Sequence, residues 1–327
     1  MNLRTLLTRF SRGELSIEEL QKQISVHSIE QVANDVAQLD VNREIRKEIP
    51  EVILAKGKEY ADLLEITRAA VRRNGKVIVS KVQPEQLLNR LCKALKKIKL
   101  EIEVGKKSST ILVWDKSHFT TNATSRNSTS NQTSNSTSNR NGTGVAPPAG
   151  KIGILAAGTS DIGIAEEARL MAKSMGCETI ASYDVGIAGM HRLFPALREM
   201  ISENVGAIVV VAGMEGALAS VVTSMVNIPV IGVPTSVGYG FGSDGVAALA
   251  SMLQSCTPGL SVVNIDNGIG AGATAALISN QLAKMTKGER KKRKQEEQEK
   301  EKTEKKYEKR QEASTTKSGR RASLKRL

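Results

Sequence analysis

The stretch KIGILAAGTSDIGIAEEARLMAKSMGCETIASYDV, residues 151–185, decides the fold, because two apolar strand patterns in it flank one helical pattern. The same alternation continues to residue 286. Strands are predicted at 151–158, 178–185, 207–213, 229–234 and 261–266, and helices at 162–175, 192–204, 216–226, 243–254 and 269–285. Apolar strands without polar alternation are typical of a parallel sheet covered on both faces. We therefore expect an α/β domain over 151–286, with a three-layer, doubly wound parallel sheet.

A smaller α+β domain is expected before it, over residues 1–113. Near the start of the chain, the pattern predicts a helix capped by Ser16, with Glu19 at the capping-box position. Further along, a β-branched strand, an amphipathic helix and a second strand are predicted at 76–82, 84–95 and 110–114.

Two segments lack the apolar residues that a core requires. Residues 114–150 are rich in Ser, Thr and Asn, and we interpret them as a linker. Residues 287–327 hold most of the excess positive charge, and we interpret them as a solvated, disordered tail. Phosphate contacts with nucleic acid are the alternative for this tail, but they would be peripheral to the chemistry.

The composition argues against several classes of protein. The chain has 327 residues and a net charge of +13, yet only 3% of its residues are aromatic, and modules for single-stranded nucleic acid need exposed rings. Its three cysteines stand far apart and it has only three histidines, which makes a disulfide scaffold or a zinc cluster improbable. We find no signal peptide and no apolar run of about 18 residues. The expected location is therefore the cytoplasm.

The functional site is expected at the carboxyl ends of the strands, where doubly wound sheets bind their ligands. The loops at these ends begin at Gly158, Val185, Gly213, Pro234 and Asp266.

Several polar residues in these loops also have an ordinary structural interpretation. Ser160 and Asp161 can simply cap the helix that follows them. A single His191 beside Arg192 is typical of a surface or an interface.

Glu215 is harder to interpret as structural. It lies between Gly213 and Gly216 at the mouth of a strongly apolar strand, so we expect partial desolvation to raise its pKa. Considered on its own, Cys256 at the end of the fourth helix fits the interpretation of a small, buried, apolar residue.

Taken in order, the loop sequences resemble one family closely. AAGTSD, GIAGMHR, AGMEGALASVV, PVIGVPTSVGYG, MLQSC and VVNIDNGIGAG resemble the pyridinium-3,5-biscarboxylic acid mononucleotide synthase (LarB) family, which is related to the carboxylase/mutase PurE. In the first region, Leu39–Arg46, Pro50–Val52 and Gly57–Lys58 add to the resemblance. It covers roughly residues 1–105 and 150–286, whereas the linker and the tail depart from the family pattern.

The resemblance implies a PurE-like, flavodoxin-like fold and an enzyme of nickel-pincer nucleotide biosynthesis, which supplies the lactate racemization cofactor. Such an enzyme carboxylates nicotinic acid adenine dinucleotide at C5 of the pyridinium ring with CO2 or bicarbonate, and hydrolyses the phosphoanhydride to release AMP. It also implies a homo-oligomer, in the form of an octamer. No tightly bound cofactor is implied, Mg2+ stays an option, and we assign no metal ligands.

The resemblance also assigns roles to residues. Cys256 is the implied nucleophile, because a thiolate adds to an electron-poor pyridinium and leaves again, and Glu215 is the implied general acid/base. The implied substrate-binding residues are Ser160, Asp161, His191, Arg192, Thr235, Ser236, Gly238, Asp266 and Asn267 in the second domain, and Asp40, Arg43, Arg46 and Lys58 in the first. For the last four, ordinary surface charge is the alternative.

Two other functions stay open at this point. A PurE-type aminoimidazole ribonucleotide carboxylase or mutase is the nearest, although those relatives carry a loop His where this chain has Met214–Leu218 without one. The other is a non-catalytic nucleotide-binding protein whose basic tail binds nucleic acid.

Overall fold

The structure is a computed structural model that describes residues 3–24, 29–32, 37–40, 43–116, 150–286 and 288. The predicted linker and the predicted charged tail lie almost entirely outside these residues. Met1–Asn280 form one compact unit, and Gln281–Leu327 form a second, of which residues 281–286 are described as helix. The division into domains at residues 113, 150 and 286 stays a prediction.

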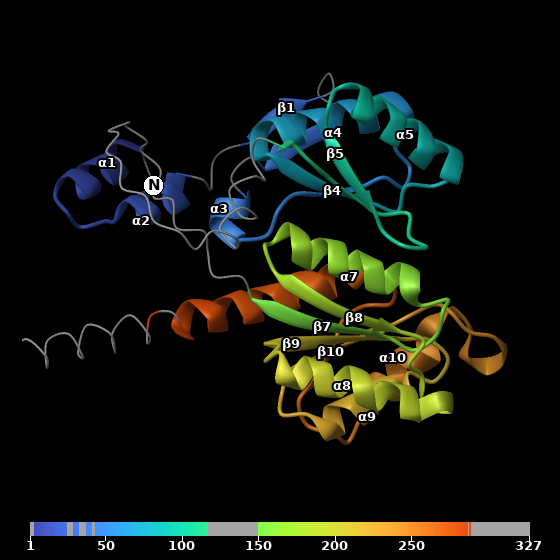
Figure 1. Ribbon diagram of the computed structural model, residues 1–327. Coiled ribbons are helices and arrows are strands. Elements are labelled where there is room, and N and C mark those ends of the chain that lie inside the picture. The colour runs from blue at the N-terminus through green and yellow to red at the C-terminus, as the bar shows by residue number, and fades with distance from the viewer. Residues whose placement is uncertain are drawn as a thin grey trace, which may run out of the picture. The chain divides into compact units, whose positions relative to one another are not determined.

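The α/β domain, residues 150–280, contains a five-stranded sheet in the order β11-β10-β9-β7-β8 (Figure 1). All neighbouring strands are parallel. Its strands are β7 (Lys151–Ala156), β8 (Glu178–Tyr183), β9 (Ala207–Ala212), β10 (Val230–Pro234) and β11 (Leu260–Val262). The order reverses between β7 and β9, as in flavodoxin-like sheets. The predicted doubly wound parallel sheet is therefore confirmed.

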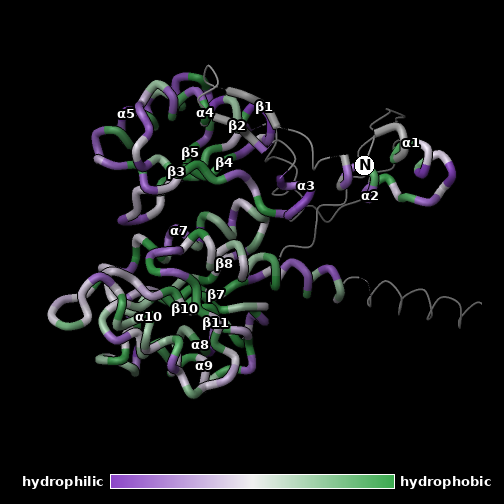
Figure 2. Tube along the Cα trace, turned by 180° about the vertical axis from the view of Figure 1, so that it is seen from behind, coloured by the Kyte–Doolittle hydropathy of each residue, from purple (hydrophilic) through white to green (hydrophobic). Residues whose placement is uncertain are grey.

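Helices cover both faces of this sheet, because the strands are apolar on both sides. They are α7 (Ile162–Ser174), α8 (Leu193–Ser202), α9 (Ala217–Met225), α10 (Val246–Leu253) and the helical residues 268–280. On one face, α7 and residues 268–280 pack on Ile152, Ile154 and Val209, whereas α8, α9 and α10 pack on the other face. Figure 2 shows the hydrophobic strands at the centre of this domain.

Small residues let two of these helices approach closely. A Cβ at Gly272 would overlap the carbonyl oxygen of Ala168 on α7, so the helix after β11 lies directly against α7.

The N-terminal domain, residues 3–116, is built around a four-stranded mixed sheet in the order β3-β4-β6-β5. This sheet consists of β3 (Val52–Leu54), β4 (Lys76–Ser80), β5 (Glu101–Val104) and β6 (Ile111–Trp114), and it is covered by α4 (Tyr60–Asn74) and α5 (Glu85–Lys97). The other face contributes Ile78 and Leu112 to the core that contains α7. The smaller α+β domain is thus present and packs on the α/β domain through a shared apolar core.

The start of the chain adds short elements to this domain. They are α1 (Leu3–Ser11), α2 (Ile17–Ile24), β1 (Ile29–Val32), β2 (Ala37–Asp40) and α3 (Arg43–Lys47). The backbone N–H of Glu19 donates to Ser16 Oγ at 3.1 Å, so the predicted helix cap is confirmed. Within the part of the chain that the structure describes, no helix has the length and apolarity needed to cross a bilayer.

Candidate functional site

A buried hydrogen bond joins the loops after β7 and β10. Thr235 Oγ1 donates to Asp161 Oδ1 at 2.6 Å, and the Gly158 N–H donates to Asp161 Oδ2 at 2.8 Å. Burial raises the pKa of Asp161, although these hydrogen bonds act against it. Asp161 makes no side-chain cap on α7, so the capping interpretation is wrong for this residue. Both side-chain oxygens of Asp161 have partners within the loops. Asp161 and Thr235 therefore hold the loops after β7 and β10 in position.

A second contact joins the loops after β10 and the last strand, β11. Asp266 Oδ1 accepts a hydrogen bond from the Ser236 N–H at 2.9 Å. The next residue, Asn267, accepts from the Gly270 N–H at 2.9 Å and so caps the helix that follows. Asp266 also lines the pocket described next, whereas Asn267 is used within the fold.

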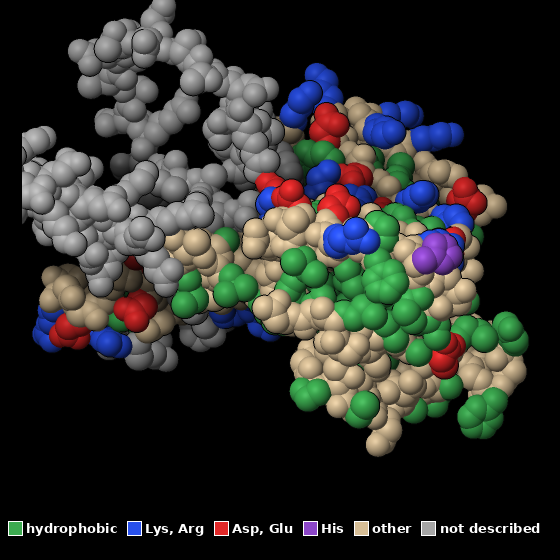
Figure 3. All heavy atoms as spheres, turned by 60° about the horizontal axis from the view of Figure 1, so that its bottom comes forward, with side chains coloured by type: hydrophobic (Ala, Val, Ile, Leu, Met, Phe, Trp, Pro, Cys, Tyr) green, Lys and Arg blue, Asp and Glu red, His purple; other side chains and the backbone are tan. Residues whose placement is uncertain are grey.

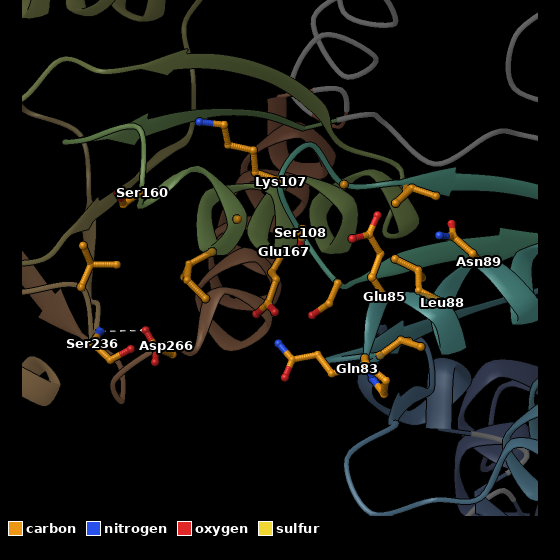
Figure 4. Close-up of a pocket in the computed structure, with 18 residues that line it drawn as sticks. Gln83, Glu85, Leu88, Asn89, Lys107, Ser108, Ser160, Glu167, Ser236 and Asp266 are labelled. Atoms are coloured by element: carbon orange, nitrogen blue, oxygen red, sulfur yellow. Dashed lines mark hydrogen bonds between the residues drawn. The ribbon is translucent and has the colours of Figure 1, made fainter.

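These loops border a pocket of about 1100 Å³ between the α/β domain and the N-terminal domain (Figure 4). Three residues predicted from the sequence line it, namely Ser160, Ser236 and Asp266. From the N-terminal domain it is lined by Gln83 and Ser108, among others. The site therefore extends beyond the strand-end loops and includes the first domain.

Glu167 on α7 also lines this pocket and was missed by the sequence analysis. Only 3% of this residue is exposed. Its Oε1 accepts a hydrogen bond from Thr110 Oγ1 at 3.1 Å, whereas Oε2 has no hydrogen-bond partner among the described residues. Burial raises the pKa of Glu167 to about 7. The signal in the sequence is a pair of glutamates in an otherwise Ala-rich helix, AEEA.

Glu215 lies in the loop after β9, in front of α9, and it is exposed. The expectation that this carboxylate is partly desolvated is therefore wrong for the single chain. Met214 and Gly216 both have positive φ, 52° and 66°, so the chain turns outward at the mouth of the strand. The Met214 N–H donates to Val237 O at 2.9 Å, which places Glu215 beside the loop that contains the predicted Gly238.

Cys256 is exposed and lies between α10 and β11. The neighbouring Ser255 accepts a hydrogen bond from Ser220 Oγ at 2.8 Å, and Ser220 stands five residues after Glu215 in the α9 segment. Because α9 begins at Ala217, three helical steps of about 1.5 Å separate its first residue from Ser220. Cys256 therefore lies along α9 from Glu215, towards the amino ends of the strands, and no described hydrogen bond links it to the strand-end loops.

His191 and Arg192 end the short 3₁₀ helix η2 (Ile187–Arg192) after β8. His191 is exposed, and Arg192 forms an ion pair with Asp184. The strand order reverses between β7 and β9, and β8 is the edge strand beyond β7. The loop after β8 therefore lies on the opposite side of this reversal from β10 and β11.

The four candidates in the first domain do not line the pocket described above. Asp40 pairs with Arg46, and Arg43 lies 3.7 Å from Glu51. Lys58 is exposed. These positions fit ordinary charge pairs and surface charge, which was the alternative interpretation. Among the described residues, no group of three His, Cys, Asp or Glu side chains is arranged to hold a metal ion.

Comparison with known proteins gives matches to both regions of the chain. The family described as AIR carboxylase matches residues 151–305, and the family described as LarB/PurE-like N-terminal domain matches residues 29–115. An uncharacterized protein of Methanocaldococcus jannaschii is 42% identical over 283 residues, which is 86% of this chain and 99% of that protein. The N5-carboxyaminoimidazole ribonucleotide mutase of the same organism is 34% identical over 131 residues, covering 39% of this chain and 76% of that protein.

Proposed function

Because this chain belongs to the LarB family, which joins a LarB/PurE-like N-terminal domain to an AIR carboxylase domain, we propose that it carboxylates the pyridinium ring of nicotinic acid adenine dinucleotide. The family matches support an enzyme of the PurE-like carboxylase/mutase type. The finer assignment depends on one observation. A cysteine, Cys256, follows Glu215 in a PurE-like domain whose loop after β9 contains no histidine.

In the proposed reaction, the Cys256 thiolate adds to C4 of the electron-poor ring and forms a C–S bond. The ring is then a dihydropyridine whose C5 is nucleophilic and attacks CO2. Glu215 removes the C5 proton, the C4–S bond breaks, and the thiolate leaves as the ring becomes aromatic again. Water hydrolyses the phosphoanhydride, so the products are pyridinium-3,5-biscarboxylic acid mononucleotide and AMP.

The exposure of both proposed catalytic residues is compatible with a site completed by another copy of the chain. Apolar side chains are exposed near them, with 79% of Tyr239, 63% of Val246 and 67% of Leu253 accessible. Figure 3 looks onto the α8 and α9 side of the α/β domain and shows hydrophobic side chains gathered there. We propose that copies of this chain cover such surfaces in a homo-oligomer, in the form of an octamer. A monomer in sedimentation velocity would contradict this.

The test of the reaction is direct. Purified protein receives nicotinic acid adenine dinucleotide, bicarbonate and Mg2+, and the products are separated by liquid chromatography and mass spectrometry. We expect AMP together with a mononucleotide heavier than nicotinic acid mononucleotide by one carboxyl group. If neither forms, the assignment is wrong.

A second candidate function comes from the mutase relative, which is 34% identical to this chain over 131 residues. A PurE-type enzyme would act on carboxylated or free aminoimidazole ribonucleotide. The same preparation is therefore offered both substrates, and turnover of the imidazole alone would replace our assignment with the second one.

A further inference from the structure

The pocket between the two domains contains a carboxylate that the proposed reaction does not use. In Figure 4, Glu167 projects from α7 into the space between Asp266 and Gln83. Thr110 occupies one of its oxygens, and Oε2 has no hydrogen-bond partner among the described residues. Buried carboxylate oxygens are normally hydrogen-bonded, so an unpartnered one on a side chain that lines a pocket points to a ligand that donates to it.

The position of Glu167 is fixed from three sides. Its own helix holds the backbone, and Thr110 of the N-terminal domain holds Oε1. A Cβ at Gly268 would lie 2.8 Å from the Cβ of Glu167, so the start of the last helix packs directly on this residue. Glu167 cannot easily turn away to find water or another donor, which makes it a rigid acceptor.

Two charged groups near Glu167 act on its pKa in opposite directions. Lys81 lies close enough to act against the raised pKa, and its Nζ donates to the Asp266 carbonyl oxygen at 3.4 Å. Asp266 acts in the opposite direction and keeps the pKa raised. Glu85 and Lys107 also line the pocket.

The rest of the lining is rich in uncharged hydrogen-bonding groups. These are the side chains of Gln83, Asn89, Ser108, Ser109, Ser160 and Ser236. Such groups suit a ligand with several hydroxyls, and Lys107 suits its phosphate. The volume of about 1100 Å³ lies slightly above the usual range for small-molecule and cofactor sites, so a dinucleotide fits by size.

We propose that Glu167 is a binding residue for a ribose hydroxyl of the dinucleotide substrate, which donates a hydrogen bond to Oε2. The pocket between the domains is then the nucleoside subsite, and specificity for a ribose over a deoxyribose arises there. A buried carboxylate that accepts from a ribose hydroxyl is a general solution in dinucleotide sites. The inference depends on the proposed function only for the identity of the ligand.

The test is calorimetric binding of nicotinic acid adenine dinucleotide to the full chain in CO2-free buffer, with Glu167→Gln compared with wild type. We expect roughly tenfold weaker binding, because a hydrogen bond to a charged group is lost. Glu65→Gln, at an exposed glutamate on α4, is the matched control and should bind as wild type does. Equal affinity of Glu167→Gln and wild type would overturn the proposal.

The wild-type arm of a second measurement does not depend on the folding of the variant. AMP and nicotinic acid mononucleotide are titrated into wild type, each with its 2′-deoxy and 3′-deoxy analogues. We expect one deoxy analogue of one half to bind about tenfold more weakly than its parent, and this difference to vanish in Glu167→Gln. If every deoxy analogue binds wild type like its parent, the ribose assignment is wrong.

The pH dependence separates an acceptor from a donor. Since burial raises the pKa of Glu167 to about 7, an accepting carboxylate predicts that affinity for the dinucleotide increases from pH 6 to pH 8, and that Glu167→Gln flattens the profile. An affinity that falls over this range would mean that the protonated acid donates, and would overturn the proposal. Binding that depends on Glu167 without any carboxylation would instead refute the proposed function and leave this inference standing.

Discussion

Arg169 on α7 lies 2.8 Å from Glu103 on β5, so an ion pair joins the α/β domain to the sheet of the N-terminal domain. The guanidinium also contacts Glu166 of its own helix at 2.7 Å. Burial acts to raise the pKa of Glu166, but hydrogen bonds from Arg169, Tyr183 and the Lys106 N–H outweigh it and hold the pKa below its usual value. This network fixes α7, and therefore Glu167, against the N-terminal domain.

Arg169→Ala should destabilise the protein by about 3 kcal/mol, because it leaves the buried Glu166 carboxylate without its main partner. The loss should shrink as the pH falls below 4.5, the ordinary pKa of this carboxyl group, since a carboxylate with a lowered pKa stabilises the fold only when it is ionised. Urea unfolding measures the effect. Arg198→Ala, at an exposed position on α8, is the control and should stay within about 0.5 kcal/mol of wild type.

Thr235→Val keeps the shape of the side chain but removes the hydroxyl that donates to Asp161. We expect a loss of about 1–3 kcal/mol, because Asp161 is only 3% exposed and its Oδ1 loses its partner. Thr274→Val, at an exposed site on the last helix, makes the same chemical change where it should be nearly neutral. Equal melting temperatures for the two variants would show that the contact between Thr235 and Asp161 does not stabilise the loops.

The stability of the wild-type protein should decrease between about pH 4.5 and pH 7 through Glu167. The folded protein holds a proton on Glu167 with a pKa of about 7, whereas the unfolded chain releases it at the ordinary value of 4.5, so the folded state binds more protons in this range. Relative to wild type, Glu167→Gln should therefore gain stability between pH 5 and pH 8, by about 2–3 kcal/mol. Chemical unfolding at the two pH values checks this, and a constant difference between the proteins would contradict it.

Cys256→Ser should slow carboxylation roughly a thousandfold or more, because it removes the proposed nucleophile. The melting temperature should stay unchanged, because the thiol is exposed. Cys177→Ala is the matched control. Its thiol is buried, and burial raises its pKa to about 11, so it is unsuited to act as a nucleophile at neutral pH. Turnover that survives in Cys256→Ser would rule out the covalent step.

The alternation of apolar strands and helices was sufficient to predict the sheet. The predicted strand at 207–213 is β9 (Ala207–Ala212), whose residues are all buried, and such a run is diagnostic of a central parallel strand. The loops that this sheet brings together include Asp161, Thr235 and Asp266, which the same argument pointed to.

Other features depend on contacts that no local pattern contains. Glu167 looks like any helical glutamate until Thr110, from a different domain, packs against it. Glu215 is exposed in a turn where Met214 has a positive φ, which this residue type does not predict. The location of Cys256 along α9 rests on a contact between two serines, Ser220 and Ser255, far apart in sequence.

The core that contains α7 also includes Ile78 and Leu112 from the N-terminal sheet. Apolar burial and the pair between Arg169 and Glu103 therefore hold the two domains together. Two polypeptides, one for each domain, are therefore expected to reassemble into the same site when they are produced separately and mixed.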